Sequence, residues 1–355
     1  MKKQLIGVVG FYGNEKTSAG GQEAKTCSLT RALEEKYGKE NVIRVNTFNW
    51  KKHPLRLLKS LINVGRKCKN IFVLPAQNSV KIFIPLFIFL RFFYGFKLYY
   101  AVVGGWLPSV AKDKKILSFF LKKVNKIFVE ASSMKDDLER QNFCNVEILP
   151  NFKFITPLEE KDLNYDFRPP YKLCTFSRVM KEKGIEDAIL AVNEINNKYG
   201  AELLSLDIYG KIDDGYAEEF SNICDTLPPY VKYCGMVEPE ESVNTIKDYF
   251  ALLFPTYYEG EGFAGTLIDS FAAGVPVVAS DWKYNSEIIN ESVGFVYPTK
   301  DHKALVAILE GLTSTPALIL NKKTACLKES NRYRADKAVR VIIEELERTY
   351  KSVYK

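Results

Sequence analysis

The chain alternates between short apolar segments and longer amphipathic segments, and this alternation is the feature that most limits its fold. In the first part of the chain, the apolar segments are 5–9, 42–45, 70–74, 98–103 and 126–129. A second series follows at 173–176, 204–208, 231–234, 251–254 and 277–279. Short apolar strands that alternate with helical crossovers are typical of parallel sheets covered by helices. Because 355 residues exceed one typical core, we predict two α/β domains.

The boundary between the two domains is predicted in a polar, acidic segment that runs from Pro150-Asn151 to Pro169-Pro170. We therefore expect an N-terminal domain over residues 1–150 and a C-terminal domain over residues 151–339. The clearest helix of the second domain is predicted over 184–199, where apolar residues recur on one face. A last amphipathic helix is predicted over 335–350.

The composition argues against several kinds of catalytic site. The chain has two histidines, His53 and His302, so a serine–histidine–aspartate triad or a histidine-rich metal site has almost nothing to draw on. The seven cysteines are scattered without a C-x-x-C spacing, which favours small buried side chains in a reducing compartment. No D-x-D motif occurs, so we expect no metal site of that type. The first apolar segment is too short for a signal peptide, and a cytoplasmic location is expected.

Charge is distributed unevenly along the chain. Residues 1–150 contain 26 Lys and Arg against 11 Asp and Glu, whereas the remainder contains 24 against 32. No acidic residue occurs between Glu40 and Asp113. A one-sided basic domain indicates an anionic partner, which is a nucleic acid, an anionic lipid or a substrate that carries phosphate.

The segment 82–93 is apolar on all sides, which is unusual for a helix that covers a sheet. It is too short to span a bilayer, and Pro85 and Arg91 interrupt it. One interpretation is a surface that enters the lipid interface, assisted by the basic segment 51–69; the other is a helix buried between the sheet and a neighbour. We favour the membrane interface.

The segment 251–276 carries most of the chemistry. An apolar strand leads into a Gly-rich loop, which is followed by a helical pattern. Gly274 and Pro276 mark the end of that helix. Backbone amides at such a helix start favour an anion, typically phosphate. Glu261 in the loop and Asp269 on the helix add acceptors for hydroxyl groups, so the pattern suits a nucleotide sugar. The alternative is an ordinary strand–turn–helix whose acids are only solvated.

Two cations follow the first strand of the second domain. Arg178 lies at the predicted strand end, and Lys183 lies just before the predicted helix. Cations placed there can clamp a pyrophosphate and stabilise a leaving group as its negative charge grows. The alternative is a solvated basic loop, and Lys181 has no role in this scheme.

These motifs resemble the C-terminal signature of retaining, family 4 (group 1) glycosyltransferases of the GT-B fold. That family has E-G-F-G, four residues, E-A, and then A-x-G-x-P-V. Here Glu261-Gly262-Phe263-Ala264 opens the pattern, Asp269-Ser270 stands in place of E-A, and Ala273 to Val278 closes it. Arg178 and Lys183 match the R-x-x-x-x-K-G pattern of the family. The chain departs from the family by Ala264 for Gly, Asp269 for Glu, and Tyr284-Asn285 for a Gly-Gly pair.

The resemblance implies two Rossmann-like domains that face each other across a cleft, with a C-terminal helix, about 340–355, that returns to the N-terminal domain. It implies catalytic roles for Glu261, Arg178 and Lys183. It also implies a donor site made of Gly20, Gly21, Arg178, Lys183, Glu261, Gly262, Phe263, Ala264, Gly265, Thr266 and Asp269. Gly20 and Gly21 follow the first strand, where the family has a Gly pair that faces the donor phosphates. Trp106 either lines the acceptor pocket or packs in the core.

The function that follows from the resemblance is a metal-independent, retaining transfer of a hexosyl group from a nucleoside-diphosphate sugar to an acceptor hydroxyl. We expect no cofactor and favour a UDP-sugar as donor. The expected acceptor is a lipid-linked or polysaccharide intermediate in cell-surface glycan synthesis, used on the cytoplasmic face of an anionic membrane. The alternatives are a sugar-nucleotide epimerase or phosphorylase, a membrane scaffold that only binds a sugar nucleotide, and a nucleic-acid-binding module. The last is disfavoured because the aromatic residues cluster in apolar runs.

Overall fold

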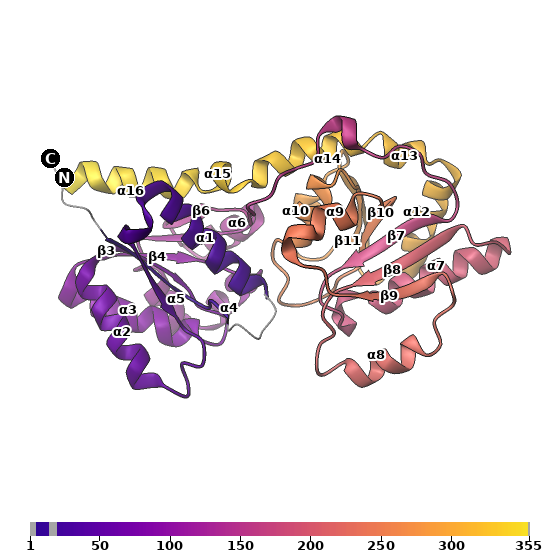
Figure 1. The fold of residues 1–355 in the computed structure, drawn as a ribbon. Helices are drawn as coiled ribbons and strands as arrows, with labels where there is room; N and C mark the ends of the chain where they lie inside the picture. Colours follow the sequence, from indigo (N-terminus) through magenta and orange to yellow (C-terminus); the bar gives the residue numbers. More distant parts are fainter. Residues whose placement is uncertain (1–4, 14–19, 354–355) are drawn as a thin grey trace. The chain divides into compact units, whose positions relative to one another are not determined.

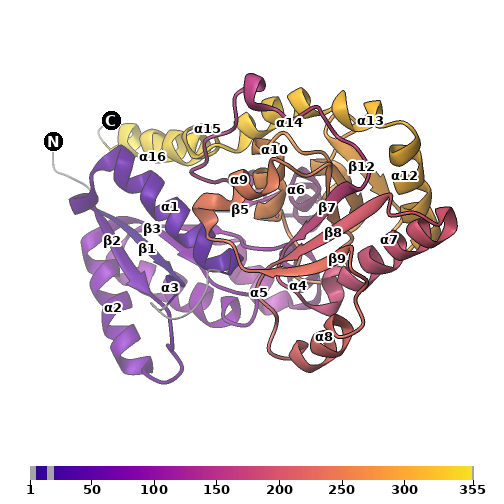
Figure 2. The same cartoon turned by 45° about the vertical axis from the view of Figure 1, so that its right-hand side comes forward.

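The chain folds into two compact α/β units, which are considered separately (Figures 1 and 2). The computed structural model describes residues 5–13 and 20–353, with side chains to residue 348. Unit 1 comprises Met1–Phe154 and Ala335–Lys355, and unit 2 comprises Ile155–Arg334. Two α/β units of this kind are what the alternation of apolar and amphipathic segments predicts.

Unit 1 is built on a parallel six-stranded sheet in the order β2-β1-β3-β4-β5-β6. Its strands are β1 (Leu5–Gly10), β2 (Val42–Asn46), β3 (Cys68–Leu74), β4 (Lys97–Ala101), β5 (Lys126–Val129) and β6 (Val146–Ile148). Its helices are α1 (Gly21–Tyr37), α2 (Pro54–Lys67), α3 (Val80–Tyr94), α4 (Leu107–Asp113), α5 (Lys115–Leu121), α6 (Ser132–Glu139), α15 (Ala335–Ala338) and α16 (Arg340–Val353). A short 3-10 helix, η1 (Lys39–Asn41), precedes β2.

The C-terminal helices α15 and α16 belong to the core of unit 1. Ala335, Val339, Ile342 and Leu346 are buried in the same apolar cluster as residues of β1, β3 and α1. The expected return of the C-terminal segment to the N-terminal domain is therefore confirmed, although α15 and α16 replace the single predicted helix. The backbone amide of Ala335 donates to the carbonyl of Lys153 at 3.1 Å.

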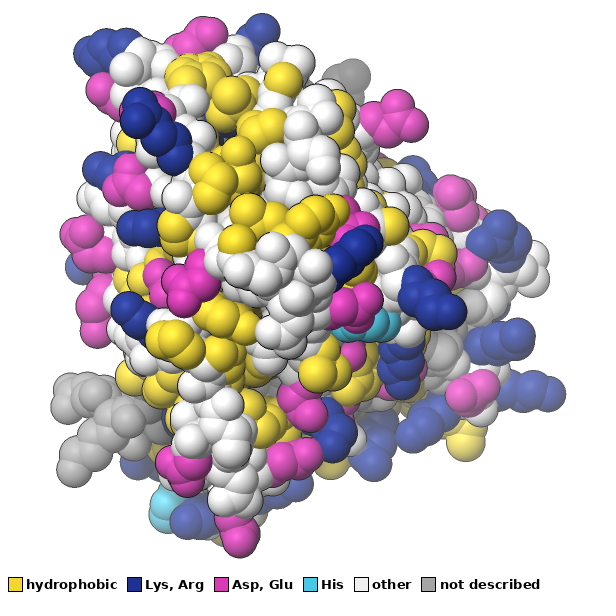
Figure 3. Space-filling model, turned by 90° about the vertical axis from the view of Figure 1, so that its right-hand side faces the viewer, with side chains coloured by type: hydrophobic (Ala, Val, Ile, Leu, Met, Phe, Trp, Pro, Cys, Tyr) yellow, Lys and Arg dark blue, Asp and Glu magenta, His cyan; other side chains and the backbone are white. Residues whose placement is uncertain are grey.

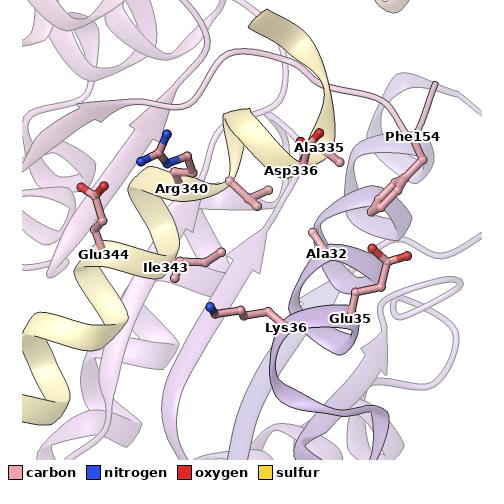
Figure 4. Close-up of a pocket in the computed structure, with 10 residues that line it drawn as sticks. Ala32, Glu35, Lys36, Phe154, Ala335, Asp336, Arg340, Ile343 and Glu344 are labelled. Carbon is pink, nitrogen blue, oxygen red and sulfur yellow. The ribbon is translucent and has the colours of Figure 1, made fainter. Parts of the chain in front are cut away.

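A cavity of about 530 Å³ lies between α1 and these C-terminal helices, within unit 1 (Figure 4). Its lining carries both signs of charge, including Glu35 and Lys36 from α1 and Asp336 and Arg340 from the C-terminal helices. Mixed charge of this kind gives no preference for an anionic or a cationic ligand.

The apolar segment around 82–93 forms helix α3, which has one buried apolar side and one exposed apolar side. Phe83, Ile84, Phe87 and Leu90 are buried on the side that faces the sheet. On the other side, the exposed apolar residues are Ile82, Phe89, Phe92 and Phe93. Helix α3 thus covers the sheet with one apolar side and exposes the other.

Unit 2 is built on a second parallel six-stranded sheet, in the order β12-β11-β10-β7-β8-β9. Its strands are β7 (Tyr171–Phe176), β8 (Leu204–Tyr209), β9 (Val231–Gly235), β10 (Ala251–Phe254), β11 (Val277–Ser280) and β12 (Gly294–Tyr297). Its helices are α7 (Ile185–Tyr199), α8 (Ala217–Cys224), α9 (Ser242–Ile246), α10 (Gly265–Ala272), α11 (Asn285–Ile288), α12 (His302–Ser314), α13 (Ala317–Leu320) and α14 (Lys323–Ser330). The 3-10 helices are η2 (Glu160–Asp162), η3 (Lys181–Lys183), η4 (Pro239–Glu241) and η5 (Asn331–Tyr333).

Acidic and basic side chains are interspersed on the face of unit 2 near α7 and α12 (Figure 3). Among the residues that the structure describes, no single helix has the length and apolarity needed to cross a membrane. One bent pair, His302–Ser314 with Ala317–Tyr333, meets those criteria together by length and composition.

Candidate functional site

Two loops meet at the carboxyl edge of the sheet in unit 2, because the strands that precede them are neighbours. Strand β7 pairs with β10, so the loops 177–184 and 255–264 leave the same edge side by side. The amide of Tyr257 donates to the carbonyl of Glu182 at 2.7 Å, and Thr256 Oγ1 lies 3.3 Å from the same carbonyl oxygen. These contacts hold the two loops together.

Gly184 lets the two loops approach this closely. Its φ is +70°, and a Cβ atom at this position would lie 2.2 Å from the carbonyl oxygen of Pro255. Any larger residue would have both a strained backbone and a clash with that carbonyl. The glycine of the R-x-x-x-x-K-G pattern therefore has a structural role beside Lys183.

Lys183 and Glu261 form an ion pair where the two loops meet. Lys183 Nζ lies 2.5 Å from Glu261 Oε2, and the two side chains are 11% and 8% exposed. Thr256 Oγ1 donates to the same carboxylate oxygen at 2.9 Å, while Glu261 Oε1 makes no hydrogen bond with any described residue. The ammonium group also lies over the rings of Phe254 and Tyr258, at 5.5 and 5.3 Å from their centroids. This environment fixes both charges in one orientation.

The other two cations of the first loop have different surroundings. Arg178 follows β7, is half exposed, and lies 3.4 Å from Asp213 Oδ2. Lys181 lies 2.7 Å from Glu219 Oε1, and this hydrogen bond raises the pKa of the lysine. Arg178 is thus held at the strand end by a weak contact, whereas Lys181 has a close partner of its own.

The N-terminus of α10 lies directly after Glu261 in the chain. The helix begins at Gly265 and has no side-chain cap, and its first amides have no partner within the helix. Thr266 Oγ1 is buried and has no hydrogen-bond partner among the described residues. Asp269 is buried one turn further along the helix, and Phe263 packs edge-on against Tyr333 with ring centroids 4.7 Å apart. The segment from Gly262 to Thr266 therefore combines backbone donors with an unused hydroxyl.

The remaining predicted site residues lie in unit 1. Gly20 and Gly21 are at the start of α1, and a Cβ atom at Gly21 would meet no atom within 4 Å. Trp106 is buried, and its indole N–H donates to the carbonyl of Val103 at 2.8 Å. Of the two interpretations of Trp106, this geometry favours packing over an exposed pocket wall.

Sequence reasoning missed several contributors to this site. Thr256 binds the Glu261 carboxylate, Tyr258 covers Lys183, and Asp213 binds Arg178. The position of Thr256 just after β10 is the one sequence signal that could have indicated it. In the part of the chain that the structure describes, no group of three or more His, Cys, Asp or Glu side chains could hold a metal ion.

The segment that carries this site is similar to a known protein family. Residues 170–315, which carry both loops, match the family described as "Glycosyl transferases group 1". An uncharacterized glycosyltransferase of Methanocaldococcus jannaschii is 20% identical over 66% of this chain and 62% of its own length. The amylovoran biosynthesis glycosyltransferase AmsK of Erwinia amylovora is 27% identical over 50% of this chain and 45% of its own length. The chain thus spans about half to two thirds of these relatives.

Solved structures resemble the whole chain in fold. Sucrose-phosphate synthase of Thermosynechococcus elongatus superimposes with a TM-score of 0.76 at 15% identity, over 99% of this chain and 100% of that one. HepE of Anabaena, solved in complex with UDP, gives a TM-score of 0.75 at 12% identity over 97% and 99%. HepE has also been solved with UDP-glucose. Residues 170–315 of the chain are thus similar to the group 1, GT4-type glycosyltransferases, and the chain as a whole has the GT-B fold.

Proposed function

We propose that the protein transfers a hexosyl group from a UDP-sugar to an acceptor hydroxyl, with retention of the anomeric configuration. The observation that carries this proposal is the Lys183–Glu261 pair, which is held beside the N-terminus of α10. The UDP and UDP-glucose complexes of HepE support the choice of base. The name of AmsK supports a role in surface polysaccharide synthesis, where an acceptor would be a glycan or lipid-linked intermediate.

The described residues suit the separate parts of such a donor. Lys183 and Arg178 would hold the diphosphate, together with the amides of Gly262 to Gly265 and the Thr266 hydroxyl. Glu261 Oε1, which makes no hydrogen bond with a described residue, would accept from hydroxyls of the transferred sugar. Asp269 would bind the ribose hydroxyls. Each charged group of the donor would then meet a partner of opposite sign or a backbone donor.

The reaction needs no protein nucleophile in this scheme. The bond between the anomeric carbon and the β-phosphate oxygen breaks, and the acceptor oxygen forms a new bond to that carbon on the same face. The proton of the acceptor hydroxyl passes to the leaving phosphate, and UDP is released. Lys183 would stabilise the charge that grows on the leaving group, so the contribution of the protein is orientation and electrostatic stabilisation.

A thermal-shift panel of nucleotide sugars tests the proposed function. We expect a UDP-sugar to raise the melting temperature, since a ligand at about 100 times its Kd stabilises the folded state by about 2.7 kcal/mol. GDP- and ADP-sugars serve as matched controls for the base. The sugar that gives the largest shift would then be tested for UDP release with and without glycan acceptors. A panel in which no nucleotide sugar shifts the melting temperature would contradict the proposed function.

We further propose that unit 1 docks on an anionic membrane through an exposed apolar patch on α3 and α5. We define the α3–α5 patch as Ile82, Phe89, Phe92, Phe93, Ile116 and Phe119. Phe92 is 85% exposed, and the rings of Phe89 and Phe93 are in contact at 5.0 Å. Arg91 of α3 donates to the carbonyl of Lys123, two residues after the end of α5, at 2.9 Å. An exposed aromatic surface of this kind fits a lipid interface.

Charge complementarity supports an anionic bilayer as the partner of the α3–α5 patch. Lysines flank the patch residues of α5 in the sequence, at 114, 115, 122 and 123, and Lys123 Nζ lies 4.5 Å from the centre of the Phe119 ring. Asp113 is the only acidic residue between Glu40 and Glu130. Each basic residue near an anionic surface contributes about 1 kcal/mol of attraction, which adds to the burial of the aromatic rings. The expected location is therefore the cytoplasmic face of a membrane, as a peripheral protein.

Vesicle flotation tests this membrane surface. We expect Phe92→Ser combined with Phe93→Ser to reduce binding to phosphatidylglycerol-rich vesicles about tenfold, because both rings lose their contact with lipid. The matched control is Leu190→Ser on α7 of unit 2, since Leu190 is 55% exposed and lies outside the patch. Equal flotation of wild type and the double variant would contradict the α3–α5 patch as a membrane surface.

A further inference from the structure

A second cavity of unit 1 lies between strand β2 and helix α2, and it extends past the carboxyl end of β2. Its volume is about 450 Å³, within the range of small-molecule sites. We call this cavity the β2–α2 pocket, and its polar and aromatic lining includes Arg44, Asn46, Trp50, His53, Arg56, Ser60 and Asn63. Ligands of parallel α/β sheets bind beyond the carboxyl ends of the strands, and the part of this pocket lined by Phe48, Trp50 and His53 lies there.

The floor of the β2–α2 pocket is held by the last residue of β2. Asn46 Oδ1 accepts from the amides of Tyr12 and Phe48, at 3.1 and 2.9 Å. Asn46 Nδ2 donates to the carbonyl of Gly13 at 3.1 Å. The pocket loop is thereby tied to the loop that follows β1. A side chain that makes three backbone contacts gives the pocket a defined shape.

The charge on the pocket walls is of one sign. No acidic residue lines the pocket, whereas Arg44, His53 and Arg56 all do. Arg44 is engaged elsewhere, because its Nε and Nη2 atoms lie 2.8 and 2.6 Å from the two carboxylate oxygens of Glu34. Arg56 forms no ion pair with any residue in the described ranges. A guanidinium without a carboxylate partner is suited to bidentate binding of a phosphate.

Helix α2 adds to this preference for an anion. It begins at Pro54 with His53 at the capping position, and it has neither a side-chain cap nor an acidic residue in its first turn. The partial positive charge of the helix start therefore adds to the charge of Arg56.

An aromatic side chain lies in the same pocket. Trp50 is half buried and packs edge-on against Phe83, with ring centroids 5.5 Å apart. This contact holds the indole in place as an apolar wall with a polar edge. Ser60 and Asn63 add a hydroxyl and an amide from α2. A ligand with a ring, several hydroxyls and a negative charge would use all of these groups.

We propose that the β2–α2 pocket binds a phosphorylated sugar of the acceptor, with the phosphate on Arg56 and His53 and the ring against Trp50. This inference rests on the proposed function, because it names the acceptor class of the same enzyme. The phosphate belongs either to a soluble sugar phosphate or to the head of a lipid-linked glycan. In both cases the recognised group is a sugar phosphate.

Binding of hexose 1-phosphates to the full chain tests this pocket. The probes are the 1-phosphates of glucose, galactose, mannose and N-acetylglucosamine, titrated with saturating UDP present to occupy any diphosphate site in unit 2. We expect one of them to bind saturably and to change tryptophan fluorescence, and Trp50→Phe to abolish that change. Arg56→Gln should weaken binding about tenfold, which is the loss of one charge-assisted contact. Lys59→Gln, which removes an exposed cation of α2 outside the pocket lining, should leave the affinity unchanged.

Three further measurements distinguish the β2–α2 pocket from the donor site, a soluble ligand from a lipid-linked one, and specific binding from a general basic surface. Lys183→Met should reduce the UDP-induced thermal shift but keep hexose 1-phosphate binding, so failure of the donor site and failure of the pocket are distinguishable. If the same probe attached to a prenyl chain binds wild type more tightly, and Arg56→Gln weakens it equally, the source is lipid-linked. The proposal is overturned if no hexose 1-phosphate binds saturably, or if Arg56→Gln binds as wild type does. It is also overturned if Arg56→Gln lowers only vesicle flotation, because the arginine would then be part of a general basic surface.

Discussion

Glu261→Gln is expected to lower turnover about a thousandfold while the chain remains folded. Glutamine has nearly the same shape but removes the charge that would hold the sugar hydroxyls, and interactions made at the reacting sugar are typically worth about 3–4 kcal/mol. It also leaves Lys183 poorly paired in a largely buried position, so we expect a loss of about 1–3 kcal/mol in the free energy of unfolding. Initial rates of UDP release at saturating donor, together with a melting curve, measure both effects.

The same loop provides a matched control for Glu261. Glu259 lies two residues earlier, is 78% exposed, and is paired with Lys283 at 2.9 Å. Exposed ion pairs contribute little, so Glu259→Gln should leave both turnover and stability near wild type. If Glu261→Gln turned over donor as fast as Glu259→Gln does, the proposed role of the buried carboxylate would be wrong.

Lys183→Met is the second substitution with a large expected effect. Methionine keeps the contact with the rings of Phe254 and Tyr258 but removes the ammonium group that would face the diphosphate. We expect turnover to fall about a hundredfold to a thousandfold, because charge on the leaving group would be stabilised less. Lys181→Met is the control, since Lys181 is exposed and paired with Glu219. Comparable rates for the two lysine variants would argue against a special role of Lys183.

Combining the two substitutions separates stability from chemistry. Each single variant leaves one partner of a buried pair without its counter-charge, whereas the double variant Lys183→Met with Glu261→Gln removes both charges. The double variant should therefore lose less stability than the sum of the singles. Its turnover should stay at the level of the lower single variant. Recovery of stability without recovery of activity would mark the pair as functional rather than structural.

The sequence was most informative where glycine and proline mark the ends of elements. The strand at 251–254, the Gly-rich loop and the helix ended by Gly274 were predictable, and the structure contains them as β10, a loop and α10. Strands β6 and β12 were missed. Strand β6 has three residues with Glu147 at its centre, and β12 starts at Gly294, so neither forms a recognisable apolar run.

The domain boundary, the Lys183–Glu261 contact and the environment of helix α3 depend on tertiary contacts that the sequence does not show. The edge of unit 1 extends to Phe154 rather than residue 150, and Phe152 is buried in the same apolar cluster as the C-terminal helices. The contact between Lys183 and Glu261 depends on the approach of Gly184 to Pro255, which joins residues that are far apart in sequence. Helix α3 could not be assigned to one environment because its sequence is apolar on both sides.

In this account, the loops at the carboxyl edge of the sheet in unit 2 bind the UDP part and the sugar part of the donor with different residues. Titration calorimetry of UDP and of the preferred UDP-sugar against wild type, Lys183→Met and Glu261→Gln tests it most directly. We predict that Lys183→Met lowers the affinity for both UDP and the UDP-sugar. Glu261→Gln should bind UDP with wild-type affinity, but it should no longer bind the UDP-sugar more tightly than UDP. Unchanged affinities of both variants for both ligands would contradict the account.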